Sequence, residues 1–281
     1  MEFLGLLTFC AVVDEGGVLA ASRVLHTVQS NVTTRIKRLE TEAGADLFFR
    51  KGRNLSLTPE GKVLLEYARQ ILHLEKQAKF AIKQSLDQGG EIRIGSMESF
   101  AAIRLPQVLL NLHEAYPSID VKINANTSRE LIHRVLMYEL DCAFIAGPFA
   151  HPDLITRTVA TEELVVVQSR EGKRADTLIV FREGCAYRER ALRWLRQHVS
   201  LFEVMEMGTL EGILGCVAFG LGVTLMPKAV VEQSQHKERL VCLPLDPDIA
   251  TIPTLLIHHK ESSMQSGMGV LGQVLESPAV A

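Results

Sequence analysis

Cysteine and uninterrupted apolar sequence are both scarce in this chain of 281 residues. The five cysteines are odd in number and scattered, with no C-x-x-C pair, so we expect neither a disulfide framework nor a zinc site. Free thiols of this kind fit a reducing compartment. No apolar run reaches the ~18 residues that a membrane span needs, and the apolar residues 1–13 lack the basic flank of a secretory signal. These absences predict a cytoplasmic protein with no membrane partner.

Motifs of the common enzyme classes are also absent. The sequence has no G-x-S-x-G, no H-E-x-x-H and no P-loop. Residues 267–272 match G-x-G-x-x-G, but they follow no strand directly and leave too little chain for a βαβ unit. His258 and His259 are adjacent, and neighbours on a strand point to opposite faces, so they form a poor metal pair. We predict no enzyme, no cofactor and no metal. The alternative is an α/β small-molecule-binding protein or an enzyme with a cryptic site.

An excess of positive charge is the third feature that the whole chain lacks. It has 30 Lys and Arg against 33 Asp and Glu, a net charge of -3, which argues against a nucleic-acid partner. Residues 23–62, however, contain eight basic and four acidic residues. This local balance of +4 leaves -7 for the rest of the chain. The net charge is therefore an average over two unlike parts.

The first sixty residues predict short helices over 3–13, 18–25 and 28–42. A chain with 47% hydrophobic and 22% charged residues is a folded globular protein, and its length suggests two domains. In the third helix Val32, Ile36 and Leu39 recur at helical spacing and face inward. Thr27 is the expected N-cap. The outward side carries Gln, Asn, Ser and Thr, poor helix formers that hydrogen-bond base edges in a major groove.

A basic hairpin and one long helix follow. Residues 47–57 predict a hairpin whose turn carries Arg50, Lys51 and Arg53, and a solvated turn is the alternative to a DNA contact. Thr58 and Pro59 begin a helix that runs to about residue 87. Its apolar residues follow the 4-3 spacing of a coiled-coil seam, which predicts dimerisation; packing on its own domain is the alternative. The seam positions are Leu64, Ala68, Ile71, Ala78 and Ile82.

Beyond Gly89-Gly90 the pattern changes to alternating strands and helices, typical of an α/β fold with mostly parallel strands. Ligands in such sheets bind at the carboxyl ends of strands. The predicted strands cover 92–95, 119–124, 142–146, 164–168, 178–181, 202–206, 223–226, 240–243 and 253–258. The main predicted helices cover 105–115, 128–140, 188–198 and 210–219.

Two N-terminal motifs carry a family resemblance. They are V-L-A-A-S-R-V-L-H-T-V-Q-S-N-V-T-T-R-I-K-R-L-E at 18–40 and A-D-L-F-F-R-K-G-R-N-L-S-L-T-P-E-G-K at 45–62. Further motifs follow in the second part of the chain: I-R-I-G-S at 92–96, A-Y-P-S-I-D-V at 115–121, E-L-D-C-A-F at 139–144 and F-G-L-G-V-T-L-M-P at 219–227. With these motifs, the chain resembles the LysR-type transcriptional regulators over almost its whole length. T-V-Q-S-N-V-T-T-R-I and G-C-A-Y-R at 184–188 look most like the branch of putrescine-utilisation regulators.

The resemblance implies a fold and an assembly. The expected fold is an N-terminal all-α winged helix-turn-helix plus a long linker helix, then a C-terminal α/β two-lobed effector domain like that of periplasmic binding proteins. The implied boundaries are 1–58, 59–88 and 89–281, with lobe I at about 91–160 plus 261–281 and lobe II at about 161–260. The linker helix implies a homodimer, commonly within a homotetramer.

For the DNA-binding end, the resemblance makes residues 28–42 the recognition helix that binds a double-stranded operator. Most members begin this helix with Ser-x-Pro, where this chain has Val28-Gln29-Ser30-Asn31. Base edges are assigned to Gln29, Asn31, Thr33 and Arg35. The DNA backbone is assigned to Ser30, Thr34 and Arg38, and the minor groove to Arg50 and Arg53 on the wing.

For the effector end, the resemblance places a small-molecule pocket between the two lobes, and effector binding changes the angle between them. Ser99, Thr127 and Ser128 are each expected at a helix N-terminus that could also face a ligand. Glu98 suits an amine and Arg188 a carboxylate, so the pair fits an amino acid or a polyamine-derived acid or aldehyde. Cys185 is either a sensor thiol with a lowered pKa or a small buried residue. The full predicted set is Ser96, Met97, Glu98, Ser99, Thr127, Ser128, Cys185, Tyr187, Arg188 and Thr209.

Overall fold

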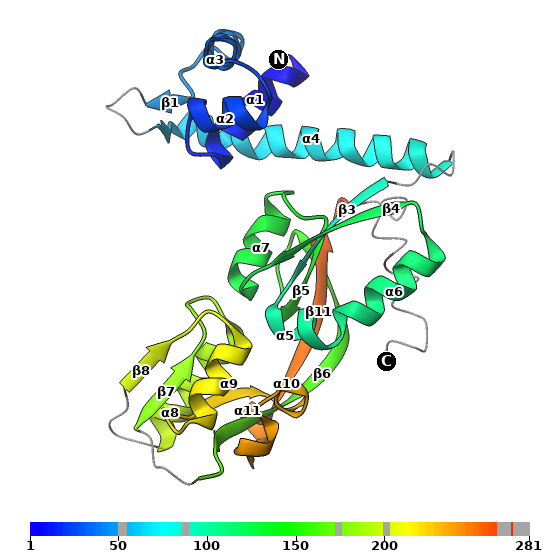
Figure 1. The fold of residues 1–281 in the computed structure, drawn as a ribbon. Helices are drawn as coiled ribbons and strands as arrows, with labels where there is room; N and C mark the ends of the chain where they lie inside the picture. The colour runs from blue at the N-terminus through cyan, green and yellow to red at the C-terminus, as the bar shows by residue number, and fades with distance from the viewer. Residues whose placement is uncertain (50–54, 86–89, 172–175, 199–202, 263–270, 272–281) are drawn as a thin grey trace. The chain divides into compact units, whose positions relative to one another are not determined.

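The computed structural model describes residues 1–49, 55–85, 90–171, 176–198, 203–262 and 271 (Figure 1). Arg50 and Arg53, predicted to meet the minor groove, lie outside the described residues. The chain divides into two compact units, 1–79 and 80–281, and each is described by itself. Because the division falls within the long helix, the domain ranges drawn from the sequence stay predictions.

The first unit is a cluster of three helices with a two-stranded ribbon. The helices are α1 (Phe3–Asp14), α2 (Val18–Val24) and α3 (Gln29–Ala43). Val32, Ile36 and Leu39 of α3 are buried in the shared core, which confirms the predicted inward face. Strand β1 (Phe48–Phe49) pairs antiparallel with β2 (Ser56–Leu57), confirming the hairpin. The ring of Phe48 packs on Phe9 at 5.4 Å between centroids, which fastens the ribbon to the helices.

The long helix α4 (Pro59–Ser85) is bound to the first unit over its first part. The Thr58 hydroxyl accepts the Gly61 N–H at 2.9 Å and donates to the Asp46 carbonyl at 2.7 Å, so it caps the helix as predicted. A Cβ at Gly61 would lie 2.2 Å from the Leu47 carbonyl oxygen, so glycine permits the close approach. Arg69 is buried and ion-paired with Asp14 of α1. The start of α4 therefore packs on its own unit.

The predicted coiled-coil seam of α4 is partly wrong. Ala68 is fully buried and Leu64 packs against the core of the first unit, because that face of α4 covers the three helices. Other apolar residues of the helix remain exposed and recur at spacings of three and four, which aligns them along one face. These residues are Val63, Tyr67, Ile71, Leu74, Ala78 and Ile82. The apolar stripe thus begins one residue earlier than predicted.

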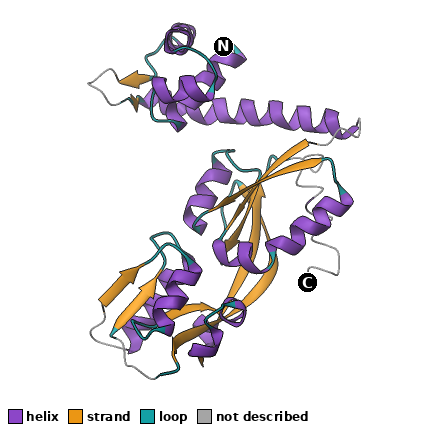
Figure 2. Cartoon of the chain, in the orientation of Figure 1, coloured by secondary structure: helices purple, strands orange, loops and turns teal. Residues whose placement is uncertain are grey.

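The second unit is built on a curved sheet of seven strands, in the order β10-β6-β11-β5-β3-β4 with β9 also on β6. A separate parallel pair joins β7 to β8. In Figure 2 these strands appear in orange. The strands are β3 (Gly90–Ser96), β4 (Ile119–Ala125), β5 (Cys142–Ala146), β6 (Leu154–Ser169), β7 (Thr177–Val180), β8 (Glu203–Glu206), β9 (Thr224–Pro227), β10 (Leu240–Pro244) and β11 (Thr251–His259).

The prediction of mostly parallel strands is wrong for the strands that join the two halves of this unit. Strand β3 pairs parallel with β4 and β5, as predicted. Strands β6 and β11 instead run antiparallel to each other from Thr251 opposite Glu163 to His259 opposite Leu154. Strand β6 then continues into antiparallel pairs with β9 and β10. Strands β6 and β11 therefore run between two halves of the unit (Figure 1). The half that contains β3, β4 and β5 is here called lobe I, and the half that contains β7 to β10 is called lobe II.

Helices cover both lobes. Lobe I carries α5, α6 and α7, and lobe II carries α8, α9, α10 and the short α11 (Figure 1). Helix α7 ends four residues before the predicted end, because Tyr138 takes a left-handed conformation at φ 57°. The helices are α5 (Glu98–Ile103), α6 (Leu105–Ala115), α7 (Ser128–Leu136), α8 (Ala186–His198), α9 (Leu210–Ala218), α10 (Lys228–Gln233) and α11 (Pro247–Ala250), with a 3-10 turn at Lys237–Arg239.

Among the described residues, no single helix is both long and apolar enough to cross a membrane. Helices α1 and α2 reach that length and composition only as a pair bent by 119°. Their inward residues form the core of the first unit.

Candidate functional site

The predicted base-reading surface lies on the exposed side of α3. Gln29, Ser30, Asn31, Thr33 and Thr34 are all exposed, and Arg35 is half-buried. The Thr33 and Thr34 hydroxyls donate to the carbonyls of Gln29 and Ser30, at 3.0 and 2.8 Å. Gln29 and Ser30 project from the first turn, where a helix in a major groove meets base edges. These residues lie around the side of α3 that the core does not cover.

Thr27 does not cap α3, contrary to the prediction. The N-cap residue is Val28, which offers no side-chain bond. The Thr27 hydroxyl instead accepts a hydrogen bond from the Asn31 side-chain amide at 3.1 Å. This contact holds the Asn31 side chain against the start of the helix, so Asn31 is less free than Gln29 to meet a base.

Arg38 is engaged with acids of its own unit. Its guanidinium pairs with Glu2 at 2.5 Å and with Glu42 at 3.2 Å. Glu42 also binds the terminal amine of Met1 at 3.2 Å, and this contact lowers the pKa of the Glu42 carboxyl. A phosphate contact by Arg38, as predicted, would have to compete with these exposed and therefore weak ion pairs.

The second unit contains a cavity of about 200 Å³ at the carboxyl ends of β3, β4 and β7. Its wall comes from the loops after these strands, the start of α8 and the loop before α9. Both lobes therefore contribute to it, at the place where ligands bind in α/β sheets. The lining residues are Met97, Glu98, Ser99, Ala125, Asn126, Thr127, Phe181, Arg182, Cys185, Tyr187 and Gly208.

Six of the predicted effector residues line this cavity, namely Met97, Glu98, Ser99, Thr127, Cys185 and Tyr187. Sequence reasoning missed five others, Ala125, Asn126, Phe181, Arg182 and Gly208. Asn126 and Arg182 follow the ends of β4 and β7 almost directly. Their position just beyond a strand is the signal that would have found them.

Four predicted effector residues lie outside the lining because other groups hold their side chains. The Ser96 hydroxyl bonds to the Met97 carbonyl, and the Ser128 hydroxyl accepts the Ala146 N–H at 3.1 Å. The Thr209 hydroxyl caps α9. The Arg188 guanidinium bonds to the Phe181 carbonyl at 2.7 Å and to Glu206 at 2.5 Å. Arg182, rather than Arg188, is the arginine of the cavity.

Several bonds join the two lobes around the cavity. The Glu98 carboxylate of lobe I accepts the Leu210 N–H at the start of α9, at 2.9 Å. Arg182 of lobe II donates to the Asn126 side-chain carbonyl at 2.8 Å. The Arg129 N–H at the start of α7 bonds to the Gly184 carbonyl at 3.3 Å. Because each bond spans the lobes, a ligand that disturbs these groups would change the angle between them.

A buried polar chain includes two residues of the lining, Ser99 and Tyr187. The Tyr187 hydroxyl is 2.8 Å from the Ser99 hydroxyl and donates to Glu162 on β6 at 2.7 Å. All three side chains are buried, and Ser99 is only 2% exposed. Ser99 therefore does not cap α5 as expected; that helix has no side-chain cap. Its hydroxyl instead ties lobe I to lobe II.

Cys185 does not have the lowered pKa of a sensor thiol. Burial raises the pKa of its thiol, and the nearby Arg188 opposes this only in part. A protonated thiol is a weak nucleophile. The structure therefore favours the alternative interpretation, a small residue packed in the wall of the cavity.

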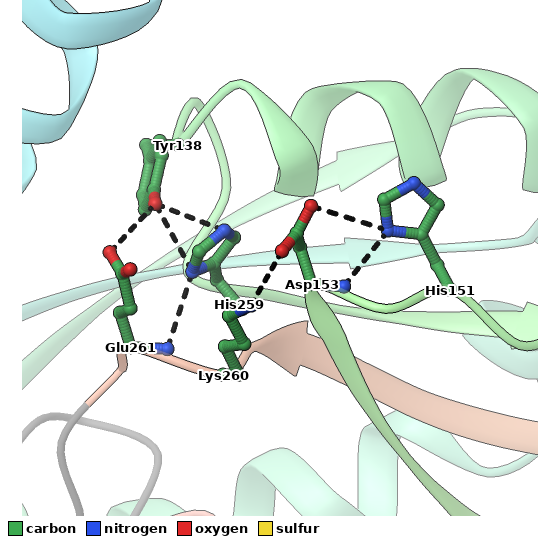
Figure 3. Close-up of polar contacts among 6 residues, drawn as sticks. All are labelled: Tyr138, His151, Asp153, His259, Lys260 and Glu261. Carbon is green, nitrogen blue, oxygen red and sulfur yellow. Dashed lines mark hydrogen bonds and ion pairs between the residues drawn. The ribbon is translucent and has the colours of Figure 1, made fainter.

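A second polar cluster lies at the end of lobe I, on the loops around β6 and β11 (Figure 3). Tyr138 bonds to the His259 ring at 3.0 Å and to Glu261 at 3.2 Å, and Lys260 bonds to Asp153 at 2.7 Å. Within the described part of the chain, no three His, Cys, Asp or Glu side chains are placed to hold a metal ion. The cluster joins the left-handed turn after α7 to the ends of both crossing strands.

Comparison with protein-family models gives two matches that together cover almost the whole chain. Residues 4–62 match the bacterial regulatory helix-turn-helix protein model of the lysR family. Residues 86–277 match the LysR substrate binding domain. The first match includes α1 to α3 and the ribbon, and the second includes the cavity.

Curated relatives match at full length. The chain is 36% identical to the HTH-type transcriptional regulator GltR of Bacillus subtilis over 266 residues, covering 92% of this chain and 90% of that protein. It is 37% identical over 274 residues to the regulator CzcR of Bacillus thuringiensis, covering 95% and 94%. Neither relative tests the resemblance to putrescine-utilisation regulators.

Solved structures share the fold at low identity. A full-length OxyR point variant from Pseudomonas aeruginosa has a TM-score of 0.74 and 19% identity, covering 100% of this chain and 96% of that one. Full-length CbnR in complex with its target DNA has a TM-score of 0.66 and 21% identity, covering 100% and 99%. At this identity the likeness concerns the fold alone.

Proposed function

The chain belongs to the LysR family of bacterial helix-turn-helix transcriptional regulators, and from this premise we propose that α3 reads an operator in double-stranded DNA while the cavity of the second unit binds a small-molecule effector. The observation that carries the proposal is the match of both family models to the two parts that contain these surfaces. This is a family of regulators and not of enzymes.

The DNA-binding part of the proposal rests on the surface of α3. Its first turn exposes Gln29 and Ser30, and amides and hydroxyls donate to and accept from base edges in the major groove. The basic residues that gather in 23–62 supply the attraction to phosphates. The neighbour CbnR was solved with its target DNA, which supports the same use of this fold here.

The regulatory part rests on the bonds that cross the cavity. An effector that binds one arrangement of the lobes more tightly than another shifts the population toward it, and by linkage operator binding shifts effector affinity equally. We propose that the bonds of Glu98 to Leu210 and of Arg182 to Asn126 are the contacts an effector alters. We propose no other cofactor.

A second copy of the chain is the proposed partner of α4. The exposed apolar stripe of Val63, Tyr67, Leu74 and its neighbours would be covered in a homodimer, and two dimers would form a tetramer. Each of the two recognition helices of the dimer then binds one half-site of the operator. A regulator of this kind acts where a bacterium keeps its chromosome, so we propose a cytoplasmic location.

Nuclease footprinting on the DNA upstream of the chain's own gene tests the proposal. We expect protection of two half-sites spaced by whole turns of the double helix, with an affinity that falls steeply with salt. A control fragment of the same length and shuffled sequence should bind far more weakly. Equal affinity for both fragments would contradict sequence-specific recognition.

A further inference from the structure

The buried chain of Glu162, Tyr187 and Ser99 reaches the wall of the cavity. Ser99 lines the cavity while its hydroxyl lies 2.8 Å from that of Tyr187. Tyr187 has one proton, and its hydroxyl lies 2.7 Å from Glu162 and 3.6 Å from the Met97 sulfur. A carboxylate is a much stronger acceptor than a thioether, so the Tyr187 proton is committed to Glu162.

The Ser99 hydroxyl must therefore donate its hydrogen bond to the Tyr187 oxygen. Burial and the nearby Glu162 raise the pKa of Tyr187 well above its usual value, so the phenol stays protonated and is the donor to Glu162. Burial also raises the pKa of Glu162, and the bond from Tyr187 and the charge of Arg104 oppose this only in part. The contact of 2.7 Å from the Tyr187 hydroxyl to the Glu162 carboxyl identifies Glu162 as the acceptor. The Tyr187 oxygen then accepts from Ser99, and only lone pairs of Ser99 are left for the cavity.

The charged residues of the lining extend this pattern. Glu98, next to Ser99, offers a carboxylate of which one oxygen accepts the Leu210 N–H. Arg182 donates one N–H group to the Asn126 side chain. Because a guanidinium has five N–H groups, others can donate to a ligand. The wall of the cavity also includes Met97, Phe181 and Cys185, which present carbon and sulfur. The cavity thus combines acceptors, donors and an apolar wall.

We infer that the effector is a compact amino acid, whose ammonium group donates to Ser99 and Glu98, whose carboxylate binds Arg182, and whose aliphatic part packs on the apolar wall. The inference rests on the proposed function, because it takes this cavity as the effector site. Glu162 is a positioning residue: it touches no ligand but holds the Tyr187 proton and so keeps Ser99 an acceptor.

Calorimetric titration of the full-length protein tests the ammonium requirement. The probes are linear amino acids from glycine to 6-aminohexanoate, each paired with the alkanoate of the same length. At least one amino acid should bind, and its alkanoate should bind at least about tenfold more weakly, because the acceptors of the wall would then stay unpaired. Equal binding of such a pair, or binding of no amino acid, would overturn the inference.

Variants of β6 test the role of Glu162. Glu162→Leu removes the acceptor, frees the Tyr187 proton for Ser99 and should reduce the preference for the amino acid to a few-fold. Glu162→Gln keeps an acceptor oxygen and should retain most of the preference for the amino acid. Glu163→Leu is the matched control, since Glu163 is exposed and paired with Lys228, and it should behave as wild type. An unchanged preference in a folded Glu162→Leu protein would overturn the inference, as would an unchanged preference in Ser99→Ala if Glu162→Leu fails to fold.

A gel-shift titration of the upstream DNA with the same probes separates the inference from the function on which it rests. Tight, amine-dependent binding that leaves DNA affinity unchanged would support the ligand class and contradict the proposed regulation. A change in DNA affinity produced equally by amino acids and alkanoates would support regulation and overturn the ligand class.

Discussion

At the scale of single residues, Gln29 is the side chain best placed to read sequence. It is exposed on the first turn of α3, and its side-chain amide makes no hydrogen bond within the described residues. Asn31, in contrast, is held by Thr27 at 3.1 Å. This difference was not predictable from the sequence, because amides two positions apart look equivalent in a helical pattern.

We expect Gln29→Ala to weaken binding to the operator by about 1–3 kcal/mol and to change non-specific binding little, because an amide that reads a base contributes only at the correct sequence. Gel shifts on operator and shuffled DNA measure both. Gln107→Ala, at an exposed amide on α6 of the second unit, is the control. Unchanged operator affinity in Gln29→Ala would show that Gln29 does not read a base.

His259 is the second residue with a measurable consequence (Figure 3). Burial lowers the pKa of its ring, and Glu261 and Asp153 oppose this only in part; burial also lowers the pKa of His258. The unfolded chain therefore takes up protons first as the pH falls below about 6.5. The unfolding free energy should decrease through that range and level off below the folded pKa values.

Urea unfolding at about pH 7.5 and about pH 5.5 checks this expectation. His259→Gln removes one of the two groups, so the loss of stability between these pH values should be smaller than in wild type. An equal loss in both proteins would show that burial of His259 does not affect proton uptake.

At the scale of elements, helix caps show how far sequence reasoning reaches. Thr27 and Thr127 precede α3 and α7 and were expected at the N-termini of these helices, and Thr209 precedes α9. The Thr209 side chain does accept the Gly212 N–H of α9, whereas Thr127 at the start of α7 makes no such bond. The residue type marks where a helix begins, but its rotamer depends on neighbours that local sequence does not reveal.

Thr209→Ala should therefore lower the unfolding free energy by about 1 kcal/mol, the usual cost of a lost cap. Thr127→Ala is the matched control and should cost less, since its hydroxyl caps nothing. Denaturant unfolding without ligand compares them. Equal losses in the two variants would contradict the assigned caps.

The exposed stripe of α4 gives the second prediction at this scale. Leu74→Asp places a charge in the apolar face and should shift the protein from dimer or tetramer toward monomer, as measured by light scattering after size exclusion. Lys79→Asp puts the same residue outside the stripe and should leave the assembly unchanged. A monomer in both variants, or in neither, would place the interface elsewhere.

At the scale of the molecule, the order of the elements could be predicted and the sheet that joins the lobes could not. Strand β6 was expected only over 164–168, because its first part carries exposed Thr, Arg and Glu residues that obscure a strand pattern. Its antiparallel pairing with β11 links residues that are 88 to 105 positions apart, which local periodicity does not encode. The lining of the cavity was predicted only in part. The loops after strands could be identified from the sequence, but the contacts of Arg188 with Phe181 and Glu206, which hold its side chain outside the lining, could not.

The distribution of charge separates the two units. Residues 23–62, which include α3, carry the balance of +4, and the remaining sequence is acidic overall. Residues 23–62 would attract the phosphates of DNA, whereas the net negative charge of the remaining sequence would be repelled by them.

The central claim is that the cavity and α3 are energetically linked. Its most direct test is the affinity of the full-length protein for its operator, measured by gel shift with and without the amino acid that binds in calorimetry, in wild type and in Arg182→Ala. We expect a change of about fivefold or more in wild type, the usual size of allosteric coupling, and little change in Arg182→Ala. Operator affinity that stays constant in wild type while the cavity is saturated would contradict it.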